Sequence, residues 1–320
     1  MLDTRFDRLS VVANQVIEHP ALVAAKSMIL RLVEQSSYYK EPVNGILTGA
    51  PGCGKTTVCD LVVAALHQDP IATEMGTQAQ RTAIYVSVPS PVTIGAVATE
   101  ILKALGDLRP ESGSAPQKTA RLSHLLKVSG TKVILLDEFQ HLFTLSTSTN
   151  LMSPKVREVQ NWLKALINSS RVPVVLIGMP DCKDLVTHEP QLRRRFSRHA
   201  CLVNLPLRGE DGASPFHSFA SSLANRTRDL LMLTAMPDIL KGEFGLRLFA
   251  ATSGNPSQVA MFYREAADYA LTHSRSEVSI NDFALVFDEN TSFTCKMGDT
   301  NPFRVPIDSV ITTLRKEGDL

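Results

Sequence analysis

The sequence predicts an α/β fold, in which a parallel sheet flanked by helices is followed by a small all-helical domain. Short apolar runs of strand length alternate with helical patterns over residues 43–207, and this alternation is typical of a parallel sheet with right-handed crossovers. After residue 207 the patterns are helical only. The 320 residues are 44% apolar, which is enough to bury the core of one large domain or two modest ones.

Residues 1–42 are predicted to form an N-terminal helical extension. One helix is expected over residues 6–18 and a second over residues 20–36, where apolar residues recur at helical spacing. Pro20 suits the first turn of the second helix, since a backbone N–H is not needed there. We expect the extension to pack beside the core, and a partner-docking arm is the alternative.

Residues 43–207 are predicted to form the α/β core. Apolar, β-branched runs predict strands over residues 43–48, 83–88, 133–136 and 172–177. Helical patterns follow these strands over residues 57–67, 93–105, 118–128 and 156–169. Turn-forming and polar residues predict loops over residues 107–117 and 146–150.

Residues 208–289 are predicted to form a helical lid. Its helices are expected over residues 214–231, 244–251, 256–272 and 280–287. About eighty residues are enough for a small core of their own. Residues 290–320 are expected to be a C-terminal tail, with a short helix near residues 308–316.

Charge and cysteine content limit the function classes only weakly. The 33 basic and 32 acidic residues give a net charge of +1, so a nucleic-acid partner would need a local basic patch. Five cysteines without close pairing favour a reducing compartment over a disulfide framework or a zinc site. The chain has no apolar run of about eighteen residues and no secretory signal pattern. We therefore expect a cytoplasmic protein without a membrane span.

The most specific motif lies between the first expected strand and the helix that follows it. It satisfies G-x-x-x-x-G-K-[ST], the Walker A or phosphate-binding loop of nucleoside triphosphatases. Glycines let backbone N–H groups point at the β-phosphate, the lysine reaches the β and γ oxygens, and the threonine hydroxyl is a Mg²⁺ ligand. A glycine turn with a stray lysine is the alternative, but it leaves the flanking strand and helix unexplained. The residues expected to bind the nucleotide are Gly49, Ala50, Pro51, Gly52, Cys53, Gly54, Lys55, Thr56 and Thr57.

An acidic pair follows the apolar run at residues 133–136, as in a Walker B motif. Asp137 is expected to hold Mg²⁺ together with Thr56, and Glu138 to orient and deprotonate the attacking water. The alternative is a simple cap, in which Asp137 accepts hydrogen bonds from nearby backbone N–H groups. The phosphate-binding loop earlier in the chain favours the catalytic interpretation.

A phosphate-binding loop in an α/β core, followed by a helical lid, resembles the AAA+ layout of P-loop NTPases. The segment at residues 135–142, Leu-Leu-Asp-Glu-Phe-Gln-His-Leu, resembles the acidic strand end of TniB/TnsC-type transposition ATPases. The N-terminal stretch and residues 175–178 and 191–196 also resemble that family. The similarity extends over roughly residues 5–290.

The resemblance implies an ATP-dependent regulator of DNA transposition. Such proteins bind ATP and Mg²⁺, assemble as rings or filaments on double-stranded target DNA, and hydrolyse ATP to disassemble. They bridge a target-selection protein and the transposase. The choice of ATP over GTP depends on the resemblance alone.

By the same resemblance, an arginine within the run at residues 193–195 is expected to reach the γ-phosphate bound by a neighbouring subunit. Arg195, directly before Phe196, is the first choice for this catalytic role, and Arg194 is the second. A guanidinium suits the task because it is planar, always charged and multidentate. The alternative is a solvated basic helix end that complements the helix dipole.

Two positions depart from the AAA+ pattern. Many AAA+ proteins place a polar sensor after the strand beside the acidic pair, whereas this chain has Met179, and a thioether is a poor partner for phosphate. The second sensor region often carries an arginine after a Gly-Asn-Pro turn, where this chain has Ser257 and Gln258. We therefore expect slow, regulatory hydrolysis. A helicase-loader-like ATPase and an ATP-bound scaffold with little turnover are the alternatives.

Residues that contact DNA are harder to select from the sequence. Lys103, Lys118, Arg121 and Lys127 lie between the two Walker motifs and could contact phosphates. A lysine on a helix is, however, usually only solvated. His141, after the acidic pair, is expected to pack or orient neighbours rather than bind a metal.

Overall fold

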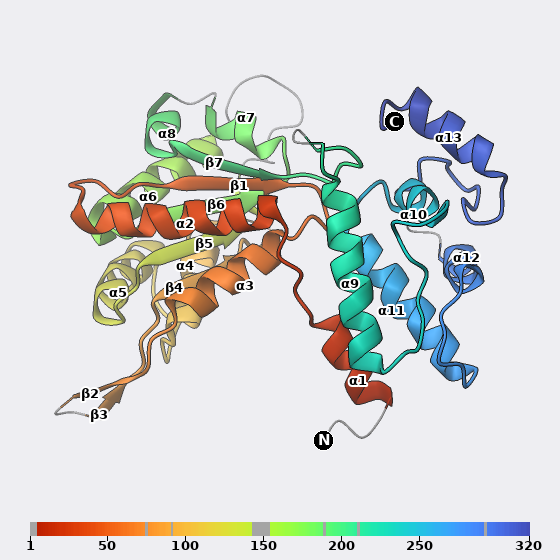
Figure 1. Cartoon of the computed structure of the whole chain (residues 1–320). Coiled ribbons are helices and arrows are strands. Elements are labelled where there is room, and N and C mark those ends of the chain that lie inside the picture. Colours follow the sequence, from red (N-terminus) through yellow and green to blue (C-terminus); the bar gives the residue numbers. More distant parts are fainter. Residues whose placement is uncertain are drawn as a thin grey trace. The chain divides into compact units, whose positions relative to one another are not determined.

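Five parallel strands form the sheet that the alternating pattern predicted (Figure 1). The computed structural model describes residues 5–73, 76–90, 92–142, 154–187, 190–209, 212–290 and 293–320. The strand order is β4-β5-β6-β1-β7. These strands are β1 (Gly45–Gly49), β4 (Ala83–Ser87), β5 (Val133–Asp137), β6 (Val174–Gly178) and β7 (Arg198–Leu202). The predicted α/β fold class is confirmed.

The chain divides into two compact units. Residues 21–51 and 55–202 form the first, which we call the sheet unit. Residues up to 20, residues 52–54 and residues 203–320 form the second, the helical unit. Each unit has its own apolar core.

Successive side chains of each strand point to opposite faces of the sheet, and the two faces have different neighbours. One face packs against α4 (Ile94–Leu105), α5 (Ala115–Val128) and α6 (Pro154–Ser170). Its core includes Ile84, Ile134, Leu136, Leu176, Val97, Leu122 and Leu163. Side chains of the opposite parity, such as those of Tyr85 and Asp137, project from the other face. There α3 (Lys55–Leu66) contacts β1 and β4, and Figure 1 shows α2 (Pro20–Tyr38) running across the sheet.

Several short elements of the sheet unit were not predicted. Strand β7 is an edge strand that pairs only with β1, so most of its side chains are not buried and its sequence lacks an apolar run. A separate hairpin joins β2 (Ile71–Thr73) to β3 (Gly76–Gln78). The others are η1 (Phe139–Leu142) and α7 (Cys182–Thr187). Helix α8 (Pro190–Arg195) ends in the arginine run, which the sequence analysis expected at a helix end.

Helix α5 begins earlier than residue 118, where the sequence analysis placed its start. Ser114 and Gln117 form a capping box, which satisfies backbone donors in the first turn. Pro116 lies in that first turn, where its missing N–H costs nothing. A proline interpreted as part of a loop therefore helps to begin the helix.

The helical unit consists of six helices within the described residues. They are α1 (Arg5–Ala13), α9 (Pro215–Leu231), α10 (Phe244–Thr252), α11 (Pro256–Thr272), α12 (Ile280–Glu289) and α13 (Ile307–Lys316). Aromatic rings fill its centre, with Phe244, Phe262, Tyr263 and Phe283 in mutual contact. Val310 and Leu314 of α13 are fully buried in the same core. The C-terminal stretch thus contributes to this core. Among the described residues, none of the helices is both long and apolar enough to cross a membrane.

One ion pair of the helical unit leads to a stability prediction. The Arg275 guanidinium donates to both carboxylate oxygens of Asp282, at 2.5 and 2.9 Å, and the Ser279 N–H donates at 2.7 Å. Burial acts to raise the pKa of Asp282, but the hydrogen bonds from Arg275 and Ser279 outweigh it and hold the pKa below its ordinary value. The stabilisation is therefore present above the unfolded pKa of about 4 and is lost as the pH falls through the lower, folded pKa.

We expect Asp282→Asn to lower the free energy of unfolding by about 2 kcal/mol at pH 7, the usual contribution of hydrogen bonds to a charged group. Urea unfolding followed by circular dichroism checks this value. The difference from the unaltered chain should shrink below about pH 4, because the carboxylate is then protonated in the reference protein as well. A difference that stays constant down to pH 3 would contradict this account.

Candidate nucleotide-binding site

The Walker A lysine lies at the junction between strand β1 and helix α3 in the sheet unit. Strand β1 ends at Gly49, and α3 begins at Lys55. The Lys55 Nζ donates to the carbonyl oxygens of Gly49 at 2.8 Å and of Ala50 at 3.2 Å. The first N–H groups of α3 have no partner within the helix and carry the positive end of its dipole. An ammonium group and a helix N-terminus therefore meet at this loop.

The middle of the loop requires glycine. Gly52 and Gly54 have φ values of 76° and 95°, a backbone region that side chains rarely adopt. A Cβ atom on Gly52 would also lie only 2.6 Å from the Asn255 Oδ1. The Ser257 N–H donates to the Gly52 carbonyl at 3.2 Å, within the helical unit. These contacts fix the curled backbone that phosphate binding needs.

Cys53 is held inside this loop. Its side chain is fully buried, and its thiol donates to the Asn204 Oδ1 at 3.3 Å. The Asn255 Nδ2 donates to the same oxygen at 3.2 Å. The sequence motif leaves position 53 variable, but this thiol is packed and hydrogen-bonded within the loop.

The acidic pair stands at the carboxyl end of β5. Asp137 is 6% exposed, and its Oδ1 accepts the Glu138 N–H at 2.8 Å. Glu138 has a φ of 56°, a left-handed conformation that costs a non-glycine residue about 1–3 kcal/mol. The Gln140 side-chain amide donates to the Glu138 carboxylate. The chain thus adopts a strained backbone conformation at the residue that carries the second carboxylate.

Tyr85 lies beside residues of both Walker motifs. Its Oη donates to the Asp137 Oδ2 at 2.6 Å, and the Thr56 side chain lies close to the same phenol. Burial and the bond to Asp137 raise the pKa of Tyr85. Burial and the nearby Asp137 carboxylate also raise the pKa of the Cys59 thiol. Tyr85 therefore holds Asp137 on the face of the sheet that is covered by α3, the helix of Thr56.

This donor set fits Mg²⁺ only when a phosphate is bound as well. One hydroxyl and one carboxylate are oxygen donors, which Mg²⁺ prefers. The described residues contain no group of three or more His, Cys, Asp or Glu side chains that could hold a metal ion alone. Mg²⁺ usually keeps several waters and takes the remaining ligands from substrate phosphates. Thr56 and Asp137 are the residues that would hold it here.

The arginine run ends α8 next to a buried anchor. Phe196 is 5% exposed and belongs to the core of the sheet unit. The Arg195 Nη1 donates to the Asn168 Oδ1 at 2.7 Å, whereas Arg193 and Arg194 are exposed. Arg195 is therefore oriented by its own chain, and its two neighbours extend into solvent.

The two positions that depart from the AAA+ pattern have unremarkable surroundings. Met179 follows β6 and is 37% exposed. The Gln258 side chain donates to the Thr294 Oγ1 at 3.0 Å and accepts the Thr294 N–H at 3.2 Å. The Ser257 N–H donates to the Gly52 carbonyl, as described above. The side chain of Gln258 is therefore engaged with Thr294.

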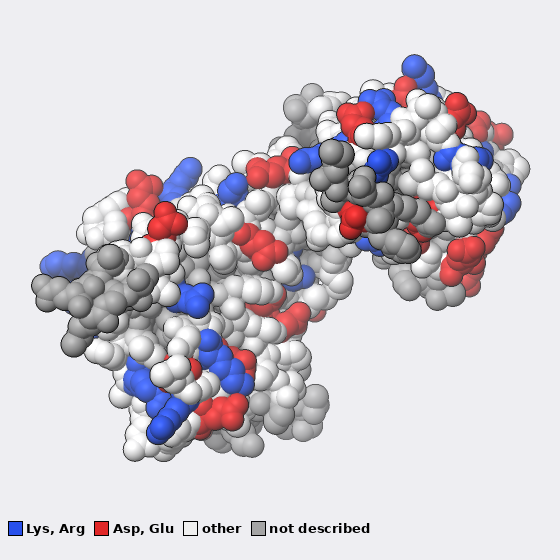
Figure 2. All heavy atoms as spheres, turned by 90° about the horizontal axis from the view of Figure 1, so that it is seen from below, with Lys and Arg blue, Asp and Glu red and all other residues white. Residues whose placement is uncertain are grey.

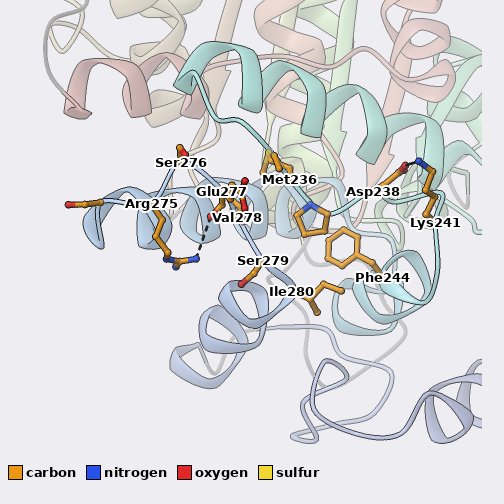
Figure 3. Close-up of a pocket in the computed structure, with 13 residues that line it drawn as sticks. Met236, Asp238, Lys241, Phe244, Arg275, Ser276, Glu277, Val278, Ser279 and Ile280 are labelled. Carbon is orange, nitrogen blue, oxygen red and sulfur yellow. Dashed lines mark hydrogen bonds and ion pairs between the residues drawn. The ribbon is translucent and has the colours of Figure 1, made fainter.

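A separate hollow of about 620 Å³ lies in the helical unit and contains none of the predicted nucleotide-binding residues (Figure 3). Its wall mixes apolar side chains, such as those of Met236, Phe244 and Ile280, with polar and charged ones. Its two cations are already paired, Lys241 with Asp238 at 3.3 Å and Arg275 with Asp282 at 2.5 Å. This hollow therefore lacks a free cation for a phosphate group.

Two of the candidate DNA contacts are engaged within the fold. The Lys103 Nζ lies 3.1 Å from Glu100 and 3.3 Å from Glu111. Arg121 pairs with Asp107 at 2.5 Å. These side chains are paired with carboxylates of their own chain, and this pairing argues against contacts with DNA phosphates.

The two remaining candidates for DNA contacts are Lys118 and Lys127. Lys118 donates to the Thr99 hydroxyl at 2.8 Å, and Lys127 is exposed. Figure 2 shows basic and acidic residues interspersed on that face of each unit. Non-specific DNA binding normally relies on clustered Lys and Arg.

Three residues that support the site were not predicted from the sequence. Tyr85 was treated only as part of a strand, although its position two residues before Ser87, the β-ladder partner of Asp137, puts both side chains on one face. Gln140 was quoted only as part of a motif. Asn204 carries no signal that the sequence alone could have revealed, because its partners are far away in the chain.

Comparisons with solved structures show a shared fold. The Aeropyrum pernix ORC2 protein, in ADPNP–ADP complexes, has a TM-score of 0.61 and 15% identity, covering 88% of this chain and 72% of that one. Cdc6p from Pyrobaculum aerophilum has a TM-score of 0.60 and 14% identity, covering 97% and 90%. The A. pernix ORC1 protein, solved in complex with DNA, has a TM-score of 0.57 and 15% identity, covering 96% and 86%. The predicted AAA+ P-loop core is confirmed as a fold.

The sequence itself also matches a family. No curated protein matches the chain by sequence. The family described as "Bacterial TniB protein" matches residues 8–203, which is more than half of the 320 residues. The matched segment includes the Walker A loop, Tyr85 and the acidic pair. This chain therefore belongs to the TniB family.

Proposed function

We propose that this protein is an ATP-dependent AAA+ regulator of DNA transposition that assembles on double-stranded DNA. The observation that carries the proposal is the hydrogen bond from Tyr85 to Asp137 on the face of the sheet that is covered by α3, the helix that begins at Lys55 and carries Thr56. Membership of the TniB family supports the transposition role. Similar structures solved in ADPNP–ADP complexes and in complex with DNA support nucleotide and DNA as ligands.

The residues take the following roles in this proposal. The loop from Gly49 to Thr57 holds the phosphates, with Lys55 as the point charge at the β and γ oxygens. Thr56 and Asp137 hold Mg²⁺, which supplies charge neutralisation at those oxygens. Glu138 accepts a proton from the attacking water.

The assembly is a ring or filament of identical subunits, in which Arg195 or Arg194 completes the neighbour's site. Each bound triphosphate is then contacted from two subunits, so hydrolysis loosens the interface and releases the DNA. The same assembly bridges a target-selection protein and the transposase. Such a role needs slow turnover, which fits a Met at the first sensor position and Gln258 engaged with Thr294.

We expect Lys55→Ala to weaken binding of Mg²⁺-ATP at least about a hundredfold, or about 2.7 kcal/mol, because charge-assisted hydrogen bonds to the phosphates are lost. Titration of a fluorescent ATP analogue measures the affinity. Lys132→Ala, an exposed lysine of the same unit, is the matched control and should bind normally. Tight binding by the Lys55 variant would refute the placement of the phosphates.

A nucleotide-bound scaffold with little turnover is the second candidate function. The weak sensor positions favour it, and the intact Glu138 opposes it. Phosphate release with and without duplex DNA separates the two. DNA-stimulated release that is absent from Glu138→Gln supports the ATPase, and release equal to that of this variant under both conditions supports the scaffold.

A further inference from the structure

We propose that Tyr85 is a positioning residue of the nucleotide site, because its hydroxyl holds Asp137, one of the two side chains assigned to Mg²⁺, beneath the helix that carries the other, Thr56. The inference depends on the proposed function and adds a residue that neither Walker motif contains. It rests on one hydrogen bond, on the register of two strands and on the contact between α3 and β4.

Strand register explains why a residue of β4 reaches this point. Tyr85 pairs with Leu135, and Ser87 pairs with Asp137, so the side chains at 85 and 137 stand on the same face of adjacent strands. Helix α3, which begins at Lys55 and contacts β4, covers this face. The long phenol side chain spans the gap between strand and helix, whereas a short side chain at position 85 would end before it.

The hydrogen bonds orient Asp137 at both of its oxygens. The Oδ1 accepts the Glu138 N–H at 2.8 Å, and the Oδ2 accepts the Tyr85 hydroxyl at 2.6 Å. A carboxylate offers about four lone pairs, so each oxygen keeps one for a water on the metal. Carboxylates that bind metals are usually held in this way by neighbouring donors.

Thr56 lies near the same side chain. Helix α3, which carries Thr56, contacts β4, which carries Tyr85, and the Thr56 side chain is close to the phenol. The Tyr85 proton goes to Asp137. Tyr85 thus holds one of the two residues assigned to Mg²⁺ and lies next to the other.

If Tyr85 served only to pack the core, a different experimental result would be expected. The Tyr85 ring is half-buried and would remain in Tyr85→Phe, so a packing residue would tolerate this change. Only the hydroxyl holds Asp137. A measurement that depends on Mg²⁺ therefore separates positioning from packing.

The experiment compares nucleotide binding by the full chain with and without Mg²⁺. A fluorescent, non-hydrolysable ATP analogue is titrated in EDTA and then at increasing Mg²⁺. We expect Tyr85→Phe to match the unaltered chain in EDTA, and to need about tenfold more Mg²⁺ for half-maximal tightening. Tyr263→Phe is the matched control, since the Tyr263 hydroxyl is buried without a hydrogen-bond partner among the described residues. Circular dichroism confirms that both variants are folded.

The outcomes separate this inference from the proposed function. A Mg²⁺ titration of Tyr85→Phe that overlays the unaltered chain would overturn the positioning role and leave the proposed function standing. A loss of affinity that is equal with and without Mg²⁺ would also overturn it. No nucleotide binding by the unaltered chain would overturn the proposed function, and this inference with it.

Discussion

Glu138→Gln is expected to slow ATP hydrolysis about a thousandfold while ATP binding stays intact. A positioned general base contributes roughly 10²–10⁴ to the rate, and an amide cannot take a proton from the attacking water. The side chain keeps its size and its contact with Gln140, and the left-handed backbone at position 138 stays the same. The change therefore removes proton-accepting ability and little else.

Persistence of the assembly is the second consequence of Glu138→Gln. If hydrolysis loosens the subunit interface, this variant should remain on duplex DNA as ATP-bound oligomers. Electron microscopy after ATP addition and a phosphate-release assay measure the two effects. Glu158→Gln, an exposed residue on α6, is the control and should behave as the unaltered chain. Normal disassembly of the Glu138 variant would exclude Glu138 as the base.

The bend at Glu138 is itself an argument for function. A non-glycine residue at a φ of 56° is strained, and glycine or asparagine would relieve the strain. Strand β5, which precedes Glu138, is buried at every position. The strained residue therefore does not serve to end an exposed strand. What the bend provides is a second carboxylate, held by Gln140, beside the one held by Tyr85.

The central part of the fold could be predicted because its signals are local. The strand at Val133–Asp137 is buried at every position and therefore reads as an unbroken apolar run. The Walker A loop combines glycines at positive φ with a lysine at the start of a helix, a combination that few other structures need. Helix α11 was predicted with the bounds that the structure has, since Asn255 caps it and Pro256 begins it.

The rest depends on contacts that the sequence does not display. Strand β7 was missed because an edge strand with exposed Arg198 and His199 lacks an apolar face. Tyr85 was passed over because its role appears only once the register of β4 on β5 is known. Helix α13 was expected in a tail, but the spacing of Val310 and Leu314 gives it one apolar stripe that is buried.

Removing the arginine that completes the neighbour's site should lower ATP hydrolysis by about 10³ or more, the usual contribution of an arginine finger. Arg195→Ala is the first variant to test, because Asn168 and the buried Phe196 orient that side chain in advance. Arg194→Ala is the second, because its exposed side chain needs no rearrangement to reach a partner. Arg198→Ala, an exposed arginine of β7, is the control for a general loss of positive charge.

Action from the neighbouring subunit can be tested by mixing two inactive variants. Lys55→Ala subunits keep their arginines but bind nucleotide too weakly to be loaded at the ATP concentration used, while Arg195→Ala subunits bind nucleotide but lack the finger. In a head-to-tail assembly formed at equal amounts, about one site in four pairs an intact loop with an intact arginine. The mixture should therefore recover about a quarter of the unaltered activity, although each variant alone is inactive. If neither this mixture nor the one with Arg194→Ala regains activity, the arginines act within their own subunit or only as a basic helix end.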